Sequence, residues 1–169
     1  MTSSMIALSV EVDGRWLMPD HPNTELVLEV REAQSVWCRA AFTNRSVRPI
    51  RLGGFRFRLD VFEGVPGQRI RLYREGWTMT SACGSARFGE CGFEVNPGYL
   101  PFAVSSPQDY TSDQPNQFSA EHVVVLNDSK TGGCLLAGFI SSADQITRFQ
   151  VDLETSGLSR FEAFSTADG

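Results

Sequence analysis

One stretch decides the fold class of this chain: Phe55-Arg56-Phe57-Arg58-Leu59-Asp60-Val61. Apolar residues occupy every second position, and charged residues occupy the positions between them. Successive side chains of a β-strand point to opposite faces of the sheet, so this pattern predicts a strand with one face in the core and one in water. A helix would need its apolar residues three or four positions apart.

The same alternation recurs along the chain, and turn signals such as Asp13-Gly14 and Pro66-Gly67 separate the runs. We expect strands over 5–12, 25–32, 35–43, 46–52, 54–63, 69–74, 118–126, 133–141, 145–153 and 158–164. No segment has a convincing helical period. The pattern therefore predicts an all-β fold, an antiparallel β-sandwich of supersandwich type with little or no helix. Segment 76–117, rich in Gly, Ser, Pro and aromatic residues, is expected to hold at most one or two short helical turns.

The alternating runs also predict which side chains form the core. We expect eight apolar residues to lie largely buried: Phe55, Phe57, Leu59, Val61, Val123, Val125, Leu135 and Phe139.

Length and charge limit the classes of protein. The 169 residues suffice for one domain, and we expect a single sandwich over 1–169. No apolar run approaches the roughly 20 residues of a membrane span, and no signal peptide is evident, so we expect a cytoplasmic protein that does not enter a membrane. The net charge of −5 argues against a nucleic-acid partner.

Cysteine and histidine are too sparse for a metal centre. The four cysteines have no CxxC spacing and only two histidines accompany them, so we expect no metal site and no cofactor. Cys83 and Cys91 could form a disulfide in an oxidising compartment, but we expect four free thiols in the cytoplasm. Nothing places either histidine beside Cys83 as a base, so we expect no Cys-His hydrolase.

Arginine is unevenly distributed. Eight of the fourteen arginines fall between Arg45 and Arg74. This local excess is either a binding face or a solvated strand face that pairs with Asp60, Glu63 and Glu75.

A tryptophan stands at the head of the long loop, in Tyr73-Arg74-Glu75-Gly76-Trp77. An indole offers a large flat surface for stacking on a sugar ring, at little cost in rotamer entropy. The alternative is a tryptophan that closes one end of the sandwich core.

Three segments together carry a resemblance to a known family: Tyr73-x-x-Gly76-Trp77, then Phe118-Ser119-Ala120-Glu121-His122 before Val123-Val124-Val125-Leu126, then Gly133-Cys134-Leu135-Leu136-Ala137-Gly138-Phe139. Over residues 55–169 the chain resembles the N-terminal β-sandwich of the melibiase-type α-galactosidases (glycoside hydrolase family 36), which are related to the raffinose synthases. Thr78-Met79-Thr80 stands where that family has Gln-Ser-Trp.

The resemblance implies an accessory, non-catalytic domain. In the family both catalytic aspartates lie on a following (β/α)8 barrel, which needs about 250 residues and cannot fit in this chain. The resemblance thus implies the N-terminal part of a longer enzyme that acts on an α-galactoside-like carbohydrate. Its sandwich would pack on the barrel, support homo-oligomer contacts and contribute Trp77, Thr78 and Met79 to the substrate site.

Two other classes of function stay open. One is a free-standing, lectin-like carbohydrate-binding sandwich that uses Trp77, Tyr99 and Tyr110 as a stacking platform. The other is a structural domain whose exposed sheet packs on a partner.

Overall fold

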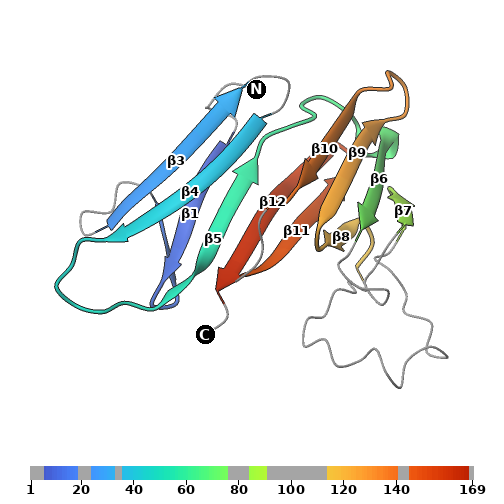
Figure 1. The fold of residues 1–169 in the computed structure, drawn as a ribbon. Helices are drawn as coiled ribbons and strands as arrows, with labels where there is room; N and C mark the ends of the chain where they lie inside the picture. Colours follow the sequence, from blue (N-terminus) through green and yellow to red (C-terminus); the bar gives the residue numbers. More distant parts are fainter. Residues whose placement is uncertain are drawn as a thin grey trace.

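The structure, a computed structural model, describes residues 6–18, 24–32, 36–75, 84–90, 114–140 and 145–167. Within these ranges the chain is built of β-strands, with one short 3-10 turn at Gly67–Arg69. All strand pairs are antiparallel, and they form stacked sheets (Figure 1). The predicted all-β antiparallel sandwich is confirmed. None of the described segments is a helix long and apolar enough to cross a membrane.

The strands of the described ranges form three sheets. The largest has six strands in the order β2-β1-β5-β12-β11-β8, the second has four in the order β10-β9-β6-β7, and β3 pairs with β4 alone. Their bounds are β1 Ile6–Val12, β2 Arg15–Leu17, β3 Thr24–Glu32, β4 Val36–Asn44, β5 Leu52–Leu59, β6 Ile70–Glu75, β7 Gly84–Arg87, β8 Gln117–Ala120, β9 Val123–Asp128, β10 Cys134–Gly138, β11 Gln145–Glu154 and β12 Gly157–Ala167.

The six-stranded sheet has one continuous apolar face, which we call its inner face. Strand register places one row of side chains across five strands, Leu8–Phe57–Ala163–Phe149–Ala120. The alternation in each strand thus adds up to an apolar layer, since neighbouring strands keep the same phase.

Both smaller sheets cover this inner face (Figure 1). Ala40 and Phe42 of β4 pack on the β1 end of the large sheet, against Leu8 and Val10. The four-stranded sheet covers the β11–β8 end, and its buried side chains join those of the large sheet in one cluster. The core of this cluster contains Ile70, Leu72, Val124, Leu126, Phe118, Phe149, Val151 and Phe161, all at most 2% exposed.

The predicted core is correct in location but wrong in detail. Of the eight residues, Val61 is buried in the larger cluster, and Phe57, Leu59, Leu135 and Phe139 are half-buried at the margin of that cluster. Phe55 is half-buried against the smaller cluster of Leu8 and Val10. In β9 the phase is opposite to the prediction, because Val124 and Leu126 face the core and Val123 and Val125 face outward.

Several predicted strands differ from those observed. Residues 46–52 do not form a strand before Leu52, because Asn44 folds the chain back: its side chain donates to the Arg48 carbonyl and accepts from the Ser46 amide, each at 2.9 Å. The predicted strand 118–126 is two strands in different sheets, β8 and β9. The short strands β2 and β7 were not predicted.

An ion pair with a buried carboxylate anchors the β9–β10 turn to the 3-10 turn before β6. Asp128, 2% exposed, accepts two hydrogen bonds from the Arg69 guanidinium. It also accepts from the Thr131 hydroxyl and the Lys130 amide. The Arg69 hydrogen bond, with help from Thr131, holds the pKa of the Asp128 carboxyl far below its usual range.

Candidate functional site

The sequence-predicted site residues Trp77, Thr78 and Met79 lie outside the described residues, as do Tyr99 and Tyr110. What the structure describes is the base of the β6–β7 connection that carries residues 77–79. Arg74 of β6 lies opposite Gly84 of β7. The Arg74 side chain is 4% exposed and donates to the Ser119 carbonyl at 3.1 Å, which ties the base to β8.

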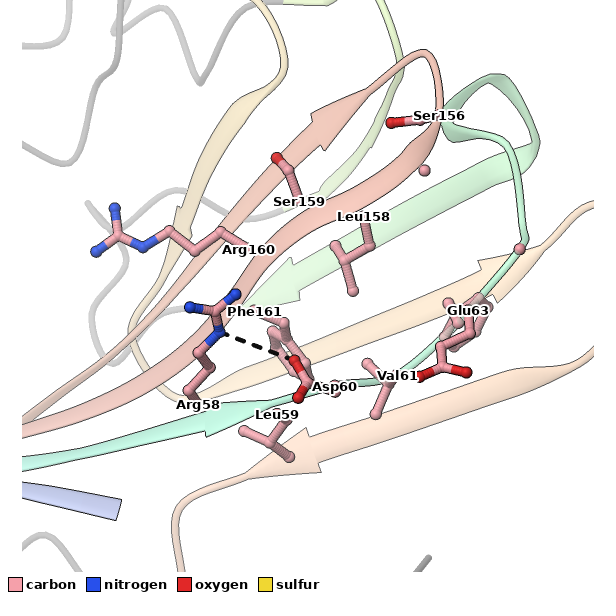
Figure 2. A pocket seen from close by; sticks show the side chains of 13 residues that line it. Arg58, Leu59, Asp60, Val61, Glu63, Ser156, Leu158, Ser159, Arg160 and Phe161 are labelled. Atoms are coloured by element: carbon pink, nitrogen blue, oxygen red, sulfur yellow. Dashed lines mark ion pairs between the residues drawn. The ribbon is translucent and has the colours of Figure 1, made fainter. Parts of the chain in front are cut away.

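A pocket of about 190 Å³ opens where β5 separates from β12 (Figure 2). The two strands pair as far as Arg58 opposite Glu162, after which the chain turns away. Positive φ angles at Phe62 (58°) and Gly64 (70°) make that turn. The first residues of β12 therefore lose their neighbour on the β5 side, and the gap becomes the pocket.

Polar and apolar side chains together line this pocket. Figure 2 shows Arg58 paired with Asp60 at 3.8 Å, with Glu63 farther along the same loop. Ser159 and Arg160 line it from the β12 side. Guanidinium, carboxylate and hydroxyl groups can together donate and accept hydrogen bonds, as the hydroxyl groups of a sugar require. The volume is below the roughly 300–1,000 Å³ of drug-sized sites, so only a small group fits.

The outer face of the six-stranded sheet carries a second feature, which shares Arg160 with the pocket. We call it the arginine–aromatic cluster, and it consists of Trp16, Arg56, Phe164, Arg148 and Arg160. The Arg56 guanidinium carbon lies 3.8 Å from the centroid of the Trp16 ring. Three guanidinium carbons surround the Phe164 ring at 5.2, 5.7 and 5.8 Å, from Arg56, Arg148 and Arg160. Phe164 is only 9% exposed although no sheet covers this face within the described ranges.

The arginines of the cluster differ in how their charge is balanced. Arg160 pairs with Glu162 at 2.7 Å and approaches Asp152 at 3.7 Å. Neither Arg56 nor Arg148 has a carboxylate within 4 Å in the part of the chain that the structure describes. The Nε atom of Arg56 is buried and has no hydrogen-bond partner among the described residues.

The arginine excess at 45–74 does not form a single face. Arg56 lies in the cluster, Arg69 binds Asp128, and Arg74 is buried. Arg71 projects from the outer face of the four-stranded sheet, away from Arg56. The arginines that join Arg56 come from β11 and β12, about a hundred positions away, so sequence reasoning missed Arg148 and Arg160.

Two of the four cysteines lie within the described residues. Cys38 and Cys134 are exposed free thiols, whereas Cys83 and Cys91 lie outside the described residues. In the described segments no three His, Cys, Asp or Glu side chains gather as a metal site would require.

Comparisons of the chain with protein-family models, curated proteins and solved structures find no match.

Proposed function

We propose that this chain is a non-catalytic β-sandwich domain of an α-galactosidase-like glycoside hydrolase. In this proposal it packs on a catalytic barrel and contributes Trp77, Thr78 and Met79 to the carbohydrate-binding site. The enzyme is cytoplasmic and oligomeric, and its substrate is an α-galactoside-like sugar.

One observation carries the proposal: Tyr73 of the first segment and Val125 of the second are 52 positions apart in the chain but lie opposite each other in the fold. β6 ends directly before Gly76-Trp77, and β6 pairs with β9, which pairs with β10 of the Leu135-Leu136 segment. Arg74 ties the same region to β8, which contains Ser119. This adjacency supports a shared architecture, since two unrelated matches this far apart in the chain would not be expected to meet in one sheet. The third segment follows the second in the same hairpin.

The carboxylates of the described ranges give further support for a non-catalytic role. Asp128, Glu162, Asp152 and Asp60 each pair with an arginine. A retaining glycosidase needs two carboxyl groups about 5–5.5 Å apart, one of which donates a proton. The Arg69 guanidinium holds the pKa of the Asp128 carboxyl far below its usual range, so Asp128 is a poor proton donor.

The test compares the 169-residue chain with the full-length enzyme on an aryl α-galactoside. We expect no hydrolysis by the chain alone. In the enzyme, Trp77→Ala should lower kcat/KM by roughly ten- to a hundredfold, about 1.4–2.7 kcal/mol, because the indole closes one face of the bound ring. Trp77→Phe should retain part of the activity, and Val47→Ala, at a fully exposed position, should leave it unchanged. Hydrolysis by the chain alone, or unchanged kinetics in Trp77→Ala, contradicts the proposal.

The polar pocket between β5 and β12 favours a second candidate, a free-standing lectin-like sandwich. Its hydrogen-bonding side chains suit a single sugar residue. Calorimetric titration of the chain with galactose distinguishes the two. An accessory domain should bind no tighter than millimolar, a free energy of about 4 kcal/mol, whereas a lectin should bind more tightly and lose affinity in Arg58→Gln.

A further inference from the structure

The strand β10 is an open edge of the four-stranded sheet. It is outermost in the order β10-β9-β6-β7 and pairs with β9 alone among the described strands. The Phe139 amide, just after β10, donates to the His122 carbonyl on the β9 side. Backbone groups alternate between the two sides of a strand, so Cys134, Leu136 and Gly138 direct their N–H and C=O groups away from β9. The edge therefore presents backbone groups that can pair with another strand.

The devices that usually protect an open edge are missing from β10. Such edges commonly carry a charge, a proline or a bulge. No charged residue and no proline occurs between Lys130 and Asp144, and the β9–β10 register has no bulge. The other edges of the four- and six-stranded sheets are limited by charge: β2 contains Arg15, β7 contains Arg87, and β8 runs directly into Glu121. The unprotected edge of β10 favours a role in pairing with a partner strand.

An apolar row of side chains leads to this edge on the outer face of the four-stranded sheet. Strand register places Leu136 beside Val125 of β9, and Val125 beside Tyr73 of β6. Leu136 is 69% exposed and Tyr73 is 45% exposed, so both ends of the row are uncovered. Figure 1 shows the β3–β4 hairpin over the β1 end of the large sheet, apart from β10. A contiguous exposed apolar row beside an open edge is typical of a protein–protein contact.

We propose that two copies of this chain pair through β10, antiparallel and related by a two-fold axis at Leu136. The axis brings Leu136 opposite Leu136 of the second copy, and Cys134 opposite Gly138 of that copy. Each residue with outward backbone groups then meets another such residue, as the hydrogen-bonded pairs of an antiparallel ladder require. A pair centred on any other residue of β10 would leave at least one of these residues without a match in the second β10. The two four-stranded sheets thereby become one continuous sheet.

The side chains of β10 suit a second copy as the partner. Residues opposite each other in an antiparallel pair lie on the same face, so the apolar row continues through Leu136 of both copies. On the inner face, half-buried Leu135 meets Ala137 of the second copy, which places a large side chain against a small one in both directions. The net charge of −5 opposes association elsewhere on the surface, but no charge lies on β10. A two-fold contact also uses both edges at once, so the assembly closes at a dimer.

The test is sedimentation equilibrium of the 169-residue chain at micromolar concentrations, without any sugar. We expect a monomer–dimer equilibrium. Leu136→Lys and Leu136→Glu should each raise the dissociation constant by about tenfold or more, because the leucine contact is lost and like charges meet at the axis. An equimolar mixture of the two variants should regain the dimer, since opposite charges then face each other. The control Val47→Lys adds a charge at a fully exposed loop position and should change the dissociation constant less than about twofold.

Urea denaturation at concentrations below the dissociation constant establishes that each variant is folded as a monomer. If neither charged variant folds, Leu136→Ala carries the test, because it removes the contact at the axis and should raise the dissociation constant by about fivefold or more. The proposal is overturned by a wild-type chain that stays monomeric, by equal dissociation in Val47→Lys, or by a dimer that Leu136→Lys or Leu136→Ala leaves unchanged. A mixture of folded charged variants that stays monomeric also overturns it. The inference names a contact surface for the oligomer in the proposed function but rests on β10 and not on sugar binding, so its failure is distinguishable from failure of the α-galactoside test.

Discussion

Replacement of Leu126 by alanine tests the sandwich core at a fully buried position. Leu126 lies in β9, is 0% exposed and faces the large sheet. The substitution removes about three carbon groups at roughly 0.8 kcal/mol each and leaves a cavity that close packing cannot fully collapse. We therefore expect the free energy of unfolding to fall by about 3–4 kcal/mol.

The matched control is Leu136→Ala in the neighbouring strand β10. Leu136 is 69% exposed on the outer face of the same sheet, so the same chemical change should cost no more than about 0.5 kcal/mol. Urea denaturation followed by circular dichroism measures both variants. With a slope of about 2 kcal/mol per molar urea, the midpoint of Leu126→Ala should fall by roughly 1.5–2 M. Equal losses in the two variants would refute the assignment of faces in β9 and β10.

Two further predictions concern the connections between strands. In Gly67→Ala a Cβ atom would lie 2.1 Å from the Glu154 carbonyl oxygen at the end of β11. We therefore expect the free energy of unfolding, measured by urea denaturation, to fall by about 1–3 kcal/mol. A stability equal to wild type would show that the turn at Gly67 does not pack on β11. Asp128 has a lowered pKa in the folded state, so its contribution to stability is complete above the unfolded pKa of about 3.9 and declines as the pH falls toward the folded value. Asp128→Asn has no carboxylate and so lacks this pH-dependent contribution. The difference in unfolding free energy between wild type and Asp128→Asn should therefore narrow from pH 5 to pH 2. Parallel pH profiles of the urea midpoint in the two proteins would argue against the Arg69–Asp128 pair.

Period-two alternation was sufficient to predict the fold class, and it failed where alternation is absent. The run Val123-Val124-Val125-Leu126 is apolar at every position, so the sequence has no phase from which to tell inner from outer side chains. The structure places Val124 and Leu126 inward because β9 pairs with β6 between Ile70 opposite Asp128 and Glu75 opposite Val123.

The candidate sites were less predictable than the fold. Trp77 could be singled out because an aromatic residue after a strand and a glycine is a local pattern. The arginine–aromatic cluster has no local pattern, since Trp16, Arg56, Arg148 and Phe164 come from β2, β5, β11 and β12. Only the strand order places them on one face.

By itself the sequence determined that this protein is an antiparallel β-sandwich, because the direction of side chains along a strand is a local property of the backbone. It also determined where most strands begin and end, since glycine, proline and asparagine act on their own neighbours. Tertiary structure alone decided that residues 118–126 divide between two sheets, that Arg69 reaches Asp128, and that Arg56 meets Arg148 across Phe164. These features depend on which strands lie next to one another, and strand order comes from packing of the whole chain rather than from any one segment of it.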